Sequence, residues 1–457
     1  MNCEDANKSK STNRRHFLKK LAHGAALGVA GSMMAEATHA EEKPAATPNI
    51  NTAPKKKMKT IHDLIDKVVL QRDDIDGFLD PNAPNWAAFD PELGYVLHDS
   101  VQKDGLDGSW TIYRYGKKYG ERKVINFADM SCRLNTYGDS FTQCHQVSDG
   151  ETWQEYLAAH LGEPIRNFGV GGYGVYQAYR RLLRTEKTQI GTPYVILNIW
   201  GTDDHYRSLD SWRYPRCYTF FSRRRDAHIF HANPWDHIGF DLQTGKVVEK
   251  KNVCPTPASL YNLCDKEFIY ETFKDDPAIN IHLGSRMDYE VNTGLLKQLA
   301  EALGLSLDFS TPAKRAASTR TLYWECARRS TMWILDKVQE FTNKQNKKFL
   351  LLLSYQQNLV LDACAGKPRQ DRQFIDELNN TRIRYVDILP KHVEDFKKFN
   401  LTPKQYGRHY YIGHYKPSGN HFFAFAIKNE IVDWLNPKPP AYQNKGRTVR
   451  FEGYLPS

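Results

Sequence analysis

Segments with the character of strands and helices alternate along most of the chain, and this alternation restricts the fold more than any other feature of the sequence. The strand-like runs are residues 133–137, 164–166, 194–199, 349–353 and 383–388. The helical patterns among them, each with one apolar face, are near residues 153–161, 176–183 and 320–343. Strands that alternate with helices form a parallel sheet with helices on both faces. The sequence therefore predicts an α/β domain with a parallel sheet of about five strands.

Polar or glycine-rich blocks follow several of these strands, where open α/β sheets bind their ligands. The first is Gly138-Asp139-Ser140, which places a serine hydroxyl at the start of a helix. Ser140 is therefore a candidate nucleophile. Gly-Asp-Ser is also a good turn and helix-cap sequence, so capping is the other interpretation of this block. The other blocks are residues 167–174, 201–204 and, near the C-terminus, 413–421.

The order of the four blocks resembles the SGNH/GDSL hydrolase superfamily, over roughly residues 132–435. The resemblance implies a three-layer αβα, flavodoxin-like parallel sheet and a serine esterase that works through an acyl-serine intermediate. Ser140 would be the nucleophile and His414 the base that takes its proton. The backbone N–H groups of Ser140 and Gly172 and the side chain of residue 203 would form the oxyanion hole.

Two positions depart from the family pattern. The oxyanion side chain would be an asparagine, but this chain has Asp203, which must be protonated, turn away or serve another role such as orienting a partner. The family also places an aspartate two or three residues before the histidine, where this chain has Tyr411 and Ile412. The candidates for a substitute acid are Asp203, Asp204 and Asp362, and the sequence does not choose among them.

The first 40 residues have the composition of an export signal. Arg14 and Arg15 precede an apolar stretch at residues 21–34, which is shorter than the roughly 20 residues of a membrane-spanning helix, and small residues follow it. This pattern is typical of twin-arginine signals, so we expect a periplasmic or secreted protein. A disordered basic tail or an uncleaved anchor is the alternative.

The remaining chain divides by composition. The predicted parts are a linker (41–59), an N-terminal extension (60–130), the hydrolase-like domain (131–440) and a C-terminal tail (441–457). Within the extension, residues 94–97, 110–113 and 124–127 have the character of strands. An insert at about 206–319 interrupts the strand-helix alternation. Because it follows the third block, we expect it either to shape the substrate cleft or to be a scaffold extension.

Cysteines and histidines indicate no metal centre. Cys132 with Cys144, and Cys254 with Cys264, are candidate disulfides, although buried free thiols are the default. The run of His228, His231 and His237, with Asp226 and Asp236, matches no ligand spacing, so loop histidines are the preferred interpretation. We expect no cofactor.

The charge is mildly basic. Residues 1–40 hold six basic and three acidic residues, so their removal lowers the net charge from +10 to +7. The dispersed basic residues argue against nucleic acid and allow weak attraction to acidic polysaccharides. The expected partners are a small-molecule or polysaccharide ester substrate and the twin-arginine export machinery, with no stable membrane insertion after cleavage.

The leading hypothesis is an exported serine esterase that removes O-acyl groups from a carbohydrate. One alternative is an O-acyltransferase that passes the acyl group to a sugar hydroxyl. The other is a catalytically inactive carbohydrate-binding module that has kept the cleft. For an enzyme, deprotonation of His414 should give an activity that rises toward alkaline pH, and a required proton on Asp203 would make the profile bell-shaped.

Overall fold

The computed structural model of the chain describes residues 57–83, 85–221 and 232–443. The predicted export signal, all but the last three residues of the predicted linker, and residues 444–457 lie outside the described residues. Asp226, His228 and His231 also lie outside them. Among the described helices, none is long and apolar enough to cross a membrane.

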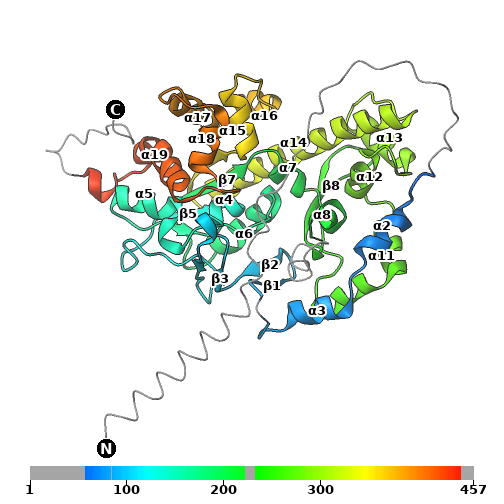
Figure 1. The fold of residues 1–457 in the computed structure, drawn as a ribbon, viewed down its shortest axis with the longest axis horizontal. Helices are drawn as coiled ribbons and strands as arrows, with labels where there is room; N and C mark the ends of the chain where they lie inside the picture. Colours follow the sequence, from blue (N-terminus) through cyan, green and yellow to red (C-terminus); the bar gives the residue numbers. More distant parts are fainter. Residues whose placement is uncertain (1–56, 84, 222–231, 444–457) are drawn as a thin grey trace, which may run out of the picture.

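A five-stranded parallel sheet organises the main domain (Figure 1). Its strands are β5 (Leu134–Tyr137), β6 (Arg166–Asn167), β7 (Tyr194–Trp200), β10 (Lys348–Ser354) and β11 (Tyr385–Asp387). Their spatial order is β6-β5-β7-β10-β11, or 2-1-3-4-5 by order in the chain. This is a common order for doubly wound sheets. The central strand β7 is buried over its whole length, as its uninterrupted apolar sequence predicts.

Two groups of helices pack around the sheet. One group pairs α5 (Trp153–Leu161) with α19 (Pro417–Trp434), which also contacts α17 (Ile388–Phe396). The other pairs α6 (Val175–Glu186) with α14 (Pro312–Lys344), and α14 also contacts α7 (Asp203–Arg207). The result is the predicted mixed α/β architecture. The remaining helices of this domain are α4 (Ser140–Gln143), α15 (Gln357–Cys364), α16 (Arg372–Leu378) and α18 (Pro403–Tyr410).

Local capping explains where two of these helices begin. The side chain of Thr152 accepts the backbone N–H of Glu155 and starts α5, while Gly162, at φ +75°, ends it. Helix α14 begins eight residues before the predicted position, because Thr311 caps it and Pro312 occupies its first position. Proline at a first helical position is favourable, since it lacks only an N–H that would have no partner there.

The N-terminal extension and the insert share a second hydrophobic core. The extension contains α2 (Ile61–Val68), α3 (Arg72–Leu79), β1 (Ala87–Asp90), β2 (Gly94–Leu97), β3 (Ser100–Gln102), η1 (Leu106–Gly108) and β4 (Thr111–Tyr113). The insert contains α8 (Tyr214–Phe221), β8 (His237–Phe240), β9 (Val247–Lys250), α10 (Pro257–Leu260), η4 (Tyr261–Cys264), α11 (Lys266–Phe273), α12 (Pro277–Gly284) and α13 (Thr293–Ala302). Their common core also includes Val170 and Tyr173 from the second glycine-rich block. Extension and insert therefore support a loop of the candidate site.

One predicted strand does not form. Residues 124–127 have a β-rich sequence, but the backbone N–H groups of Ile125 and Asn126 donate to the carboxylate of Glu155, at 2.9 and 2.7 Å. A side chain from α5 thus supplies the acceptors that a neighbouring strand would have offered. Further along the chain, η2 (Asp149–Glu151) precedes α5, and η5 (Pro440–Tyr442) follows α19.

Candidate active site

Ser140 follows a tight turn between β5 and α4. Gly138 has φ +156°, and a Cβ atom added to it would lie 2.7 Å from the carbonyl oxygen of Asn198, so a larger residue does not fit. Asp139 caps α4, because its Oδ1 accepts the backbone N–H of Phe141 at 2.9 Å. The capping role considered for Gly-Asp-Ser thus belongs to Asp139. The hydroxyl of Ser140 is left for other contacts.

The hydroxyl of Ser140 meets the imidazole of His414, which comes from the loop between α18 and α19. Ser140 Oγ lies 2.8 Å from His414 Nε2, although 274 residues separate them in the chain. The same oxygen is 3.3 Å from Asp139 Oδ2. Ser140 is 9% exposed and His414 4%. The serine and the histidine singled out in the sequence are therefore in direct hydrogen-bonding contact.

Gln146 occupies the position where an orienting acid would be expected. Its Oε1 lies 3.0 Å from His414 Nδ1 and accepts the backbone N–H of His414 at 2.9 Å. Its amide nitrogen donates to the carbonyl oxygen of Asp104 at 3.1 Å, so the amide oxygen must face the histidine. An amide oxygen only accepts, and therefore Nδ1 carries the proton. The lone pair of Nε2 is left to accept the proton of Ser140.

The three carboxylates expected as substitute acids have other partners. Asp204 accepts the backbone N–H of Trp200 at 2.9 Å, and Asp362 forms an ion pair with Lys367 at 2.8 Å. Neither these two nor Asp203 forms a hydrogen bond or ion pair with His414. The group that contacts His414 Nδ1 is therefore a neutral amide, that of Gln146, and not one of the expected acids. Nothing in the sequence pointed to Gln146, because no local pattern indicates that its side chain reaches residue 414.

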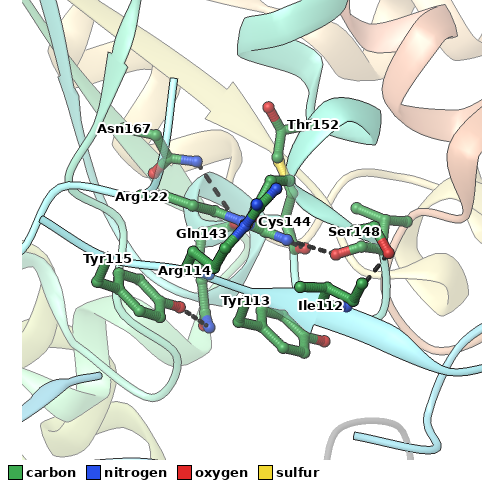
Figure 2. A network of polar contacts seen from close by, with 12 residues as sticks. Ile112, Tyr113, Arg114, Tyr115, Arg122, Gln143, Cys144, Ser148, Thr152 and Asn167 are labelled. Atoms are coloured by element: carbon green, nitrogen blue, oxygen red, sulfur yellow. Dashed lines mark hydrogen bonds and ion pairs between the residues drawn. The ribbon is translucent and has the colours of Figure 1, made fainter. Parts of the chain in front are cut away.

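The loop that carries Gln146 is held by a buried arginine from the N-terminal extension. Figure 2 shows this residue, Arg122, beside Gln143 and Cys144 of the loop. Cys144 and Gln146 both have positive φ, +59° and +72°, which is unfavourable for residues other than glycine. Arg122 Nη1 donates to the carbonyl oxygens of Gln143 and Cys144, at 2.5 and 2.8 Å, and Nη2 donates to that of Val147 at 2.5 Å. One guanidinium thus fixes three carbonyls of a strained loop.

Arg122 and its neighbour Arg114 are in turn tied to one carboxylate. Arg122 Nε pairs with Asp149 Oδ1 at 3.1 Å, and both side chains are 1% exposed. Arg114 Nε pairs with the other oxygen of Asp149 at 2.7 Å and is 44% exposed. The extension, in which the sequence shows no chemical motif, therefore builds part of the support of the site.

A second group from the extension surrounds Gln146 and His145. The hydroxyl of Tyr113 accepts the backbone N–H of Gln146 at 2.7 Å and donates to Asp104 Oδ2 at 2.8 Å. The other oxygen of Asp104 accepts the hydroxyl of Thr111. His145 Nε2 lies 3.2 Å from Asp104 Oδ2, and the ring of His145 packs edge-on against that of His414, with centroids 5.0 Å apart. The buried carboxylate Asp104 is thus linked to His414 only through these neighbours.

The surroundings of His414 favour its neutral form. Burial lowers the pKa of His414 well below its usual value, and the nearby His145 and Arg207 lower it further. Burial also lowers the pKa of His145, although Asp104 acts in the opposite direction. A neutral imidazole with an unprotonated Nε2 is the state in which a histidine accepts a proton from serine.

The second glycine-rich block lies beside Ser140. A Cβ atom added to Gly171 would be 3.6 Å from that of Ser140. The N–H of Gly171 donates to Gln143 Oε1 at 2.8 Å, and its carbonyl accepts the hydroxyl of Tyr95 at 2.6 Å. The N–H of Gly172 has no acceptor among the described residues. Gly172, which follows Gly171, therefore offers a free backbone donor on a turn at φ +85°.

Asp203 is an ionised member of a buried charge cluster rather than a neutral donor. Its two oxygens pair with Arg207 at 2.6 Å and Arg216 at 2.8 Å. Burial alone would raise the pKa of Asp203, but the two guanidinium groups outweigh it and lower the pKa far below the usual value. Of the roles considered for this position, partnering other groups is the one found. Protonation is excluded by the arginines.

Arg207 connects this cluster to the loops that carry Ser140 and Gly172. Its Nη1 donates to the carbonyl oxygen of Tyr173 at 3.2 Å and lies 3.0 Å from Asp204 and 3.7 Å from Asp139. Tyr173 follows Gly172, and Asp139 precedes Ser140. Burial raises the pKa of Asp139 to about 6 despite the nearby Arg207, and burial and Asp139 raise that of Asp204 well above its usual range. No local pattern in the sequence indicates that Arg207 belongs to the site.

The cysteines are all free in the described part of the chain, so the two candidate disulfides are not formed. Cys144 Sγ instead lies 3.4 Å from the side-chain oxygen of Gln154, and Cys132 Sγ lies 3.2 Å from the carbonyl oxygen of Leu134. Of the histidine run considered for metal, His237 is described, and its Nδ1 lies 3.1 Å from the carbonyl oxygen of Trp235. Within the described residues, His, Cys, Asp and Glu form no group of three suited to a metal ion.

The candidate site thus combines a serine, a neutral histidine fixed by an amide, a free backbone donor and a buried arginine. Comparisons of this chain with models of known protein families and with curated protein sequences find no match.

Proposed function

We propose that the protein is a serine esterase of the SGNH/GDSL type, with Ser140 as nucleophile and His414 as base. The observation that carries the proposal is the 2.8 Å contact of Ser140 Oγ with His414 Nε2, whose ring is fixed by Gln146. The four blocks occupy the order expected of that superfamily, and the strand order 2-1-3-4-5 fits its three-layer αβα, flavodoxin-like sheet. Fold likeness is a weak guide to substrate, so the residues of the site carry the argument.

The reaction follows from this geometry. Ser140 Oγ attacks the ester carbonyl while its proton passes to His414 Nε2, and the protonated histidine then gives that proton to the departing alkoxide. The N–H of Gly172, with that of Ser140, faces the tetrahedral oxyanion. Water, activated by the same histidine, then releases the acid from the acyl-Ser140 intermediate.

In this proposal Arg207 takes the place of the family's asparagine. It offers a positive charge to the oxyanion, where an asparagine at position 203 would have offered a neutral N–H dipole. Its guanidinium is fixed by Asp203, Asp204 and the carbonyl of Tyr173. A charge held in place before the reaction costs no reorganisation when negative charge develops nearby. Asp203 is on this view the anchor of Arg207, which explains why a carboxylate is tolerated at this position.

A serine-directed fluorophosphonate tests the nucleophile. Wild-type protein should be labelled at Ser140, detected by mass spectrometry of its peptides, and should release acetate from a model ester. Ser140→Ala should lose both properties without a change in thermal unfolding. Ser418→Ala, which alters a serine that bonds to the carbonyl oxygen of His409, is the matched control and should behave as the wild type.

The opposite outcome identifies the binding module. If no variant is labelled and no ester is turned over, while wild type and Ser140→Ala bind an acylated polysaccharide equally, then the site does not perform catalysis.

The enclosure of the site keeps the acyltransferase as a second candidate. Ser140 and His414 are nearly inaccessible to solvent, and limited access of water favours transfer to another acceptor. Adding a sugar acceptor during ester turnover separates the two activities. An acylated sugar formed in preference to free acid would establish the transferase.

The carbohydrate substrate and the export route are parts of the same proposal. Its support is the resemblance, the paired Arg14-Arg15 and the aromatic residues of the insert. A reporter fused to residues 1–50 should cross the membrane, and replacing both arginines by lysine should stop it. Continued export of that variant would contradict the twin-arginine assignment.

A further inference from the structure

The second glycine-rich block contains a tight turn with two glycines at its centre. The N–H of Tyr173 donates to the carbonyl oxygen of Val170 at 3.2 Å, so residues 170–173 form a β-turn. Gly172, its third residue, has φ +85°. A positive φ at this position is typical of a type II turn, whereas a type I turn has φ of about −90° there. Because Gly171 and Gly172 carry no Cβ atom, side-chain sterics exclude neither turn type.

The two turn types differ in the direction of one peptide group, the one that joins Gly171 to Gly172. From type I to type II, ψ of the second residue changes from about −30° to about +120°, and φ of the third from about −90° to about +80°. These changes turn this peptide group over. The carbonyl of Gly171 and the N–H of Gly172 point in opposite directions, since the peptide group is planar and trans. Whatever holds the carbonyl therefore also sets the direction of the N–H.

The two neighbouring peptide groups are each held at both ends. The N–H of Gly171 donates to Gln143 Oε1 at 2.8 Å, and the carbonyl of the same peptide group accepts the hydrogen bond of the turn. The carbonyl of Gly172 accepts Arg213 Nη1 at 3.2 Å, and the N–H of that peptide group donates the hydrogen bond of the turn. Among the described residues, the peptide group between them is hydrogen-bonded only at its carbonyl.

Tyr95, on strand β2 of the N-terminal extension, supplies that hydrogen bond. Its hydroxyl donates to the carbonyl oxygen of Gly171 at 2.6 Å. The hydroxyl of Tyr173 in turn donates to the carbonyl oxygen of Tyr95, and the two rings pack edge-on with centroids 5.4 Å apart. Trp235 of the insert packs against the ring of Tyr95, with centroids 6.4 Å apart. Tyr95 is fully buried, and burial raises the pKa of its hydroxyl, which therefore keeps its proton and remains a donor.

We propose that Tyr95 is a positioning residue: its hydrogen bond to Gly171 keeps the turn in the type II form and directs the N–H of Gly172 toward the oxyanion formed at Ser140. This inference rests on the proposed esterase function. Arg213 cannot replace Tyr95 in this role, because it holds the next peptide group. The extension thus serves the proposed reaction a second time, through the oxyanion donor as well as through the loop of the histidine.

Removal of one oxygen atom tests the assignment. Tyr95→Phe keeps the ring and should lower kcat for a soluble model ester at least about tenfold, because an oxyanion donor stabilises the transition state. KM should change by less than about twofold, since the bound substrate carries no such charge. Tyr194→Phe is the matched control and should keep the wild-type kcat. The buried hydroxyl of Tyr194 also donates to a backbone carbonyl, that of Asn436, but Tyr194 begins β7, at the end of the sheet opposite to Ser140.

Gly172→Ala tests whether Tyr95 acts through the turn. Alanine disfavours φ +85°, so this variant should leave the type II form and lose about a hundredfold in kcat. Adding Tyr95→Phe to it should cause little further loss, whereas independent roles would multiply the two losses. A crystal structure of Tyr95→Phe should show the peptide group between Gly171 and Gly172 turned over in at least part of the molecules, with a negative φ at Gly172.

These measurements separate the role of Tyr95 from the esterase assignment. If the wild type is active and Tyr95→Phe keeps its kcat, the positioning role is overturned while labelling of Ser140 still stands. Equal losses of kcat in Tyr95→Phe and Tyr194→Phe would overturn it too, because they would show general destabilisation. An inactive wild type contradicts the esterase assignment, and a type II turn retained in crystals of Tyr95→Phe would then overturn the role of Tyr95 as well.

Discussion

The Nδ1 of His414 and the backbone N–H of the same residue both meet one oxygen, Oε1 of Gln146, at 3.0 and 2.9 Å. A single amide therefore fixes the tautomer of the ring and the position of its loop. A carboxylate here would also stabilise the imidazolium that forms during proton transfer. The amide orients without that charge, so nothing at this position offsets the burial that lowers the pKa of His414.

Introducing the carboxylate should change the pH dependence. We expect Gln146→Glu to raise the pKa of His414, because a negative charge at 3.0 Å favours the protonated ring. The acid limb of kcat/KM should move to higher pH, and NMR titration of the imidazole should show the same shift. Gln146→Leu removes the acceptor and should lower kcat by at least about tenfold through loss of the correct tautomer. The exposed Gln405→Glu is the control, and an unchanged pH profile in Gln146→Glu would contradict the assignment.

The wild-type profile should differ from the alkaline-leaning one expected from the sequence. Because the folded-state pKa of His414 lies well below 6.5, the ring is already neutral at pH 7, and raising the pH further adds no base. Activity should stay level through neutral pH and fall only on acidification. The unfolding free energy should change with pH in the same direction as the activity. In the unfolded chain His414 binds a proton below its pKa of about 6.5, while in the folded chain it does not. Unfolding free energy should therefore decrease from neutral toward acidic pH, less so in His414→Gln.

Asp203→Asn should not raise the proposed esterase activity. It restores the amide of the family pattern but removes the carboxylate that pairs with Arg207 and Arg216. Breaking a buried pair from one side costs about 3 kcal/mol, so we expect a lower unfolding free energy in urea and a lower kcat.

The double variant Asp203→Asn, Arg207→Gln tests the pairing itself. It should lose less stability than the sum of the single variants, because it leaves no unpaired charge at these two positions. Additive losses would show that Asp203 does not anchor Arg207.

Arg122→Met should destabilise the loop that carries Gln146. The variant removes donors to three backbone carbonyls and leaves Asp149 without its buried partner, so a loss of about 3–5 kcal/mol is expected from urea unfolding. Arg114→Met is the matched control, because Arg114 pairs with the same Asp149 but is half-exposed. This variant should lose less than about 1 kcal/mol of unfolding free energy. Similar losses in both variants would contradict the role given to Arg122.

Much of the sheet could be predicted from local patterns. The apolar run at β7 and the amphipathic helices gave the parallel architecture, because their periodicity depends on the faces that each element buries. The ends of elements follow less well from such patterns: α14 begins eight residues before its predicted position, because Thr311 caps it. The prediction of a strand at residues 124–127 is wrong, because the acceptors that Glu155 supplies come from a distant helix.

The sequence by itself determined the order of strands and helices along the chain, because each follows from a short stretch with a regular period. It singled out Ser140 through the glycine turn that ends a strand, and His414 through the resemblance of its block to the family pattern. Only the tertiary structure decided that Gln146 orients the histidine, that Arg122 holds its loop, and that Asp203 pairs with Arg207 and Arg216. The sequence around these residues shows no local pattern that would indicate these contacts. Their energies depend on burial and on the distance between charges, which exist only once the sheet, the extension and the insert have come together.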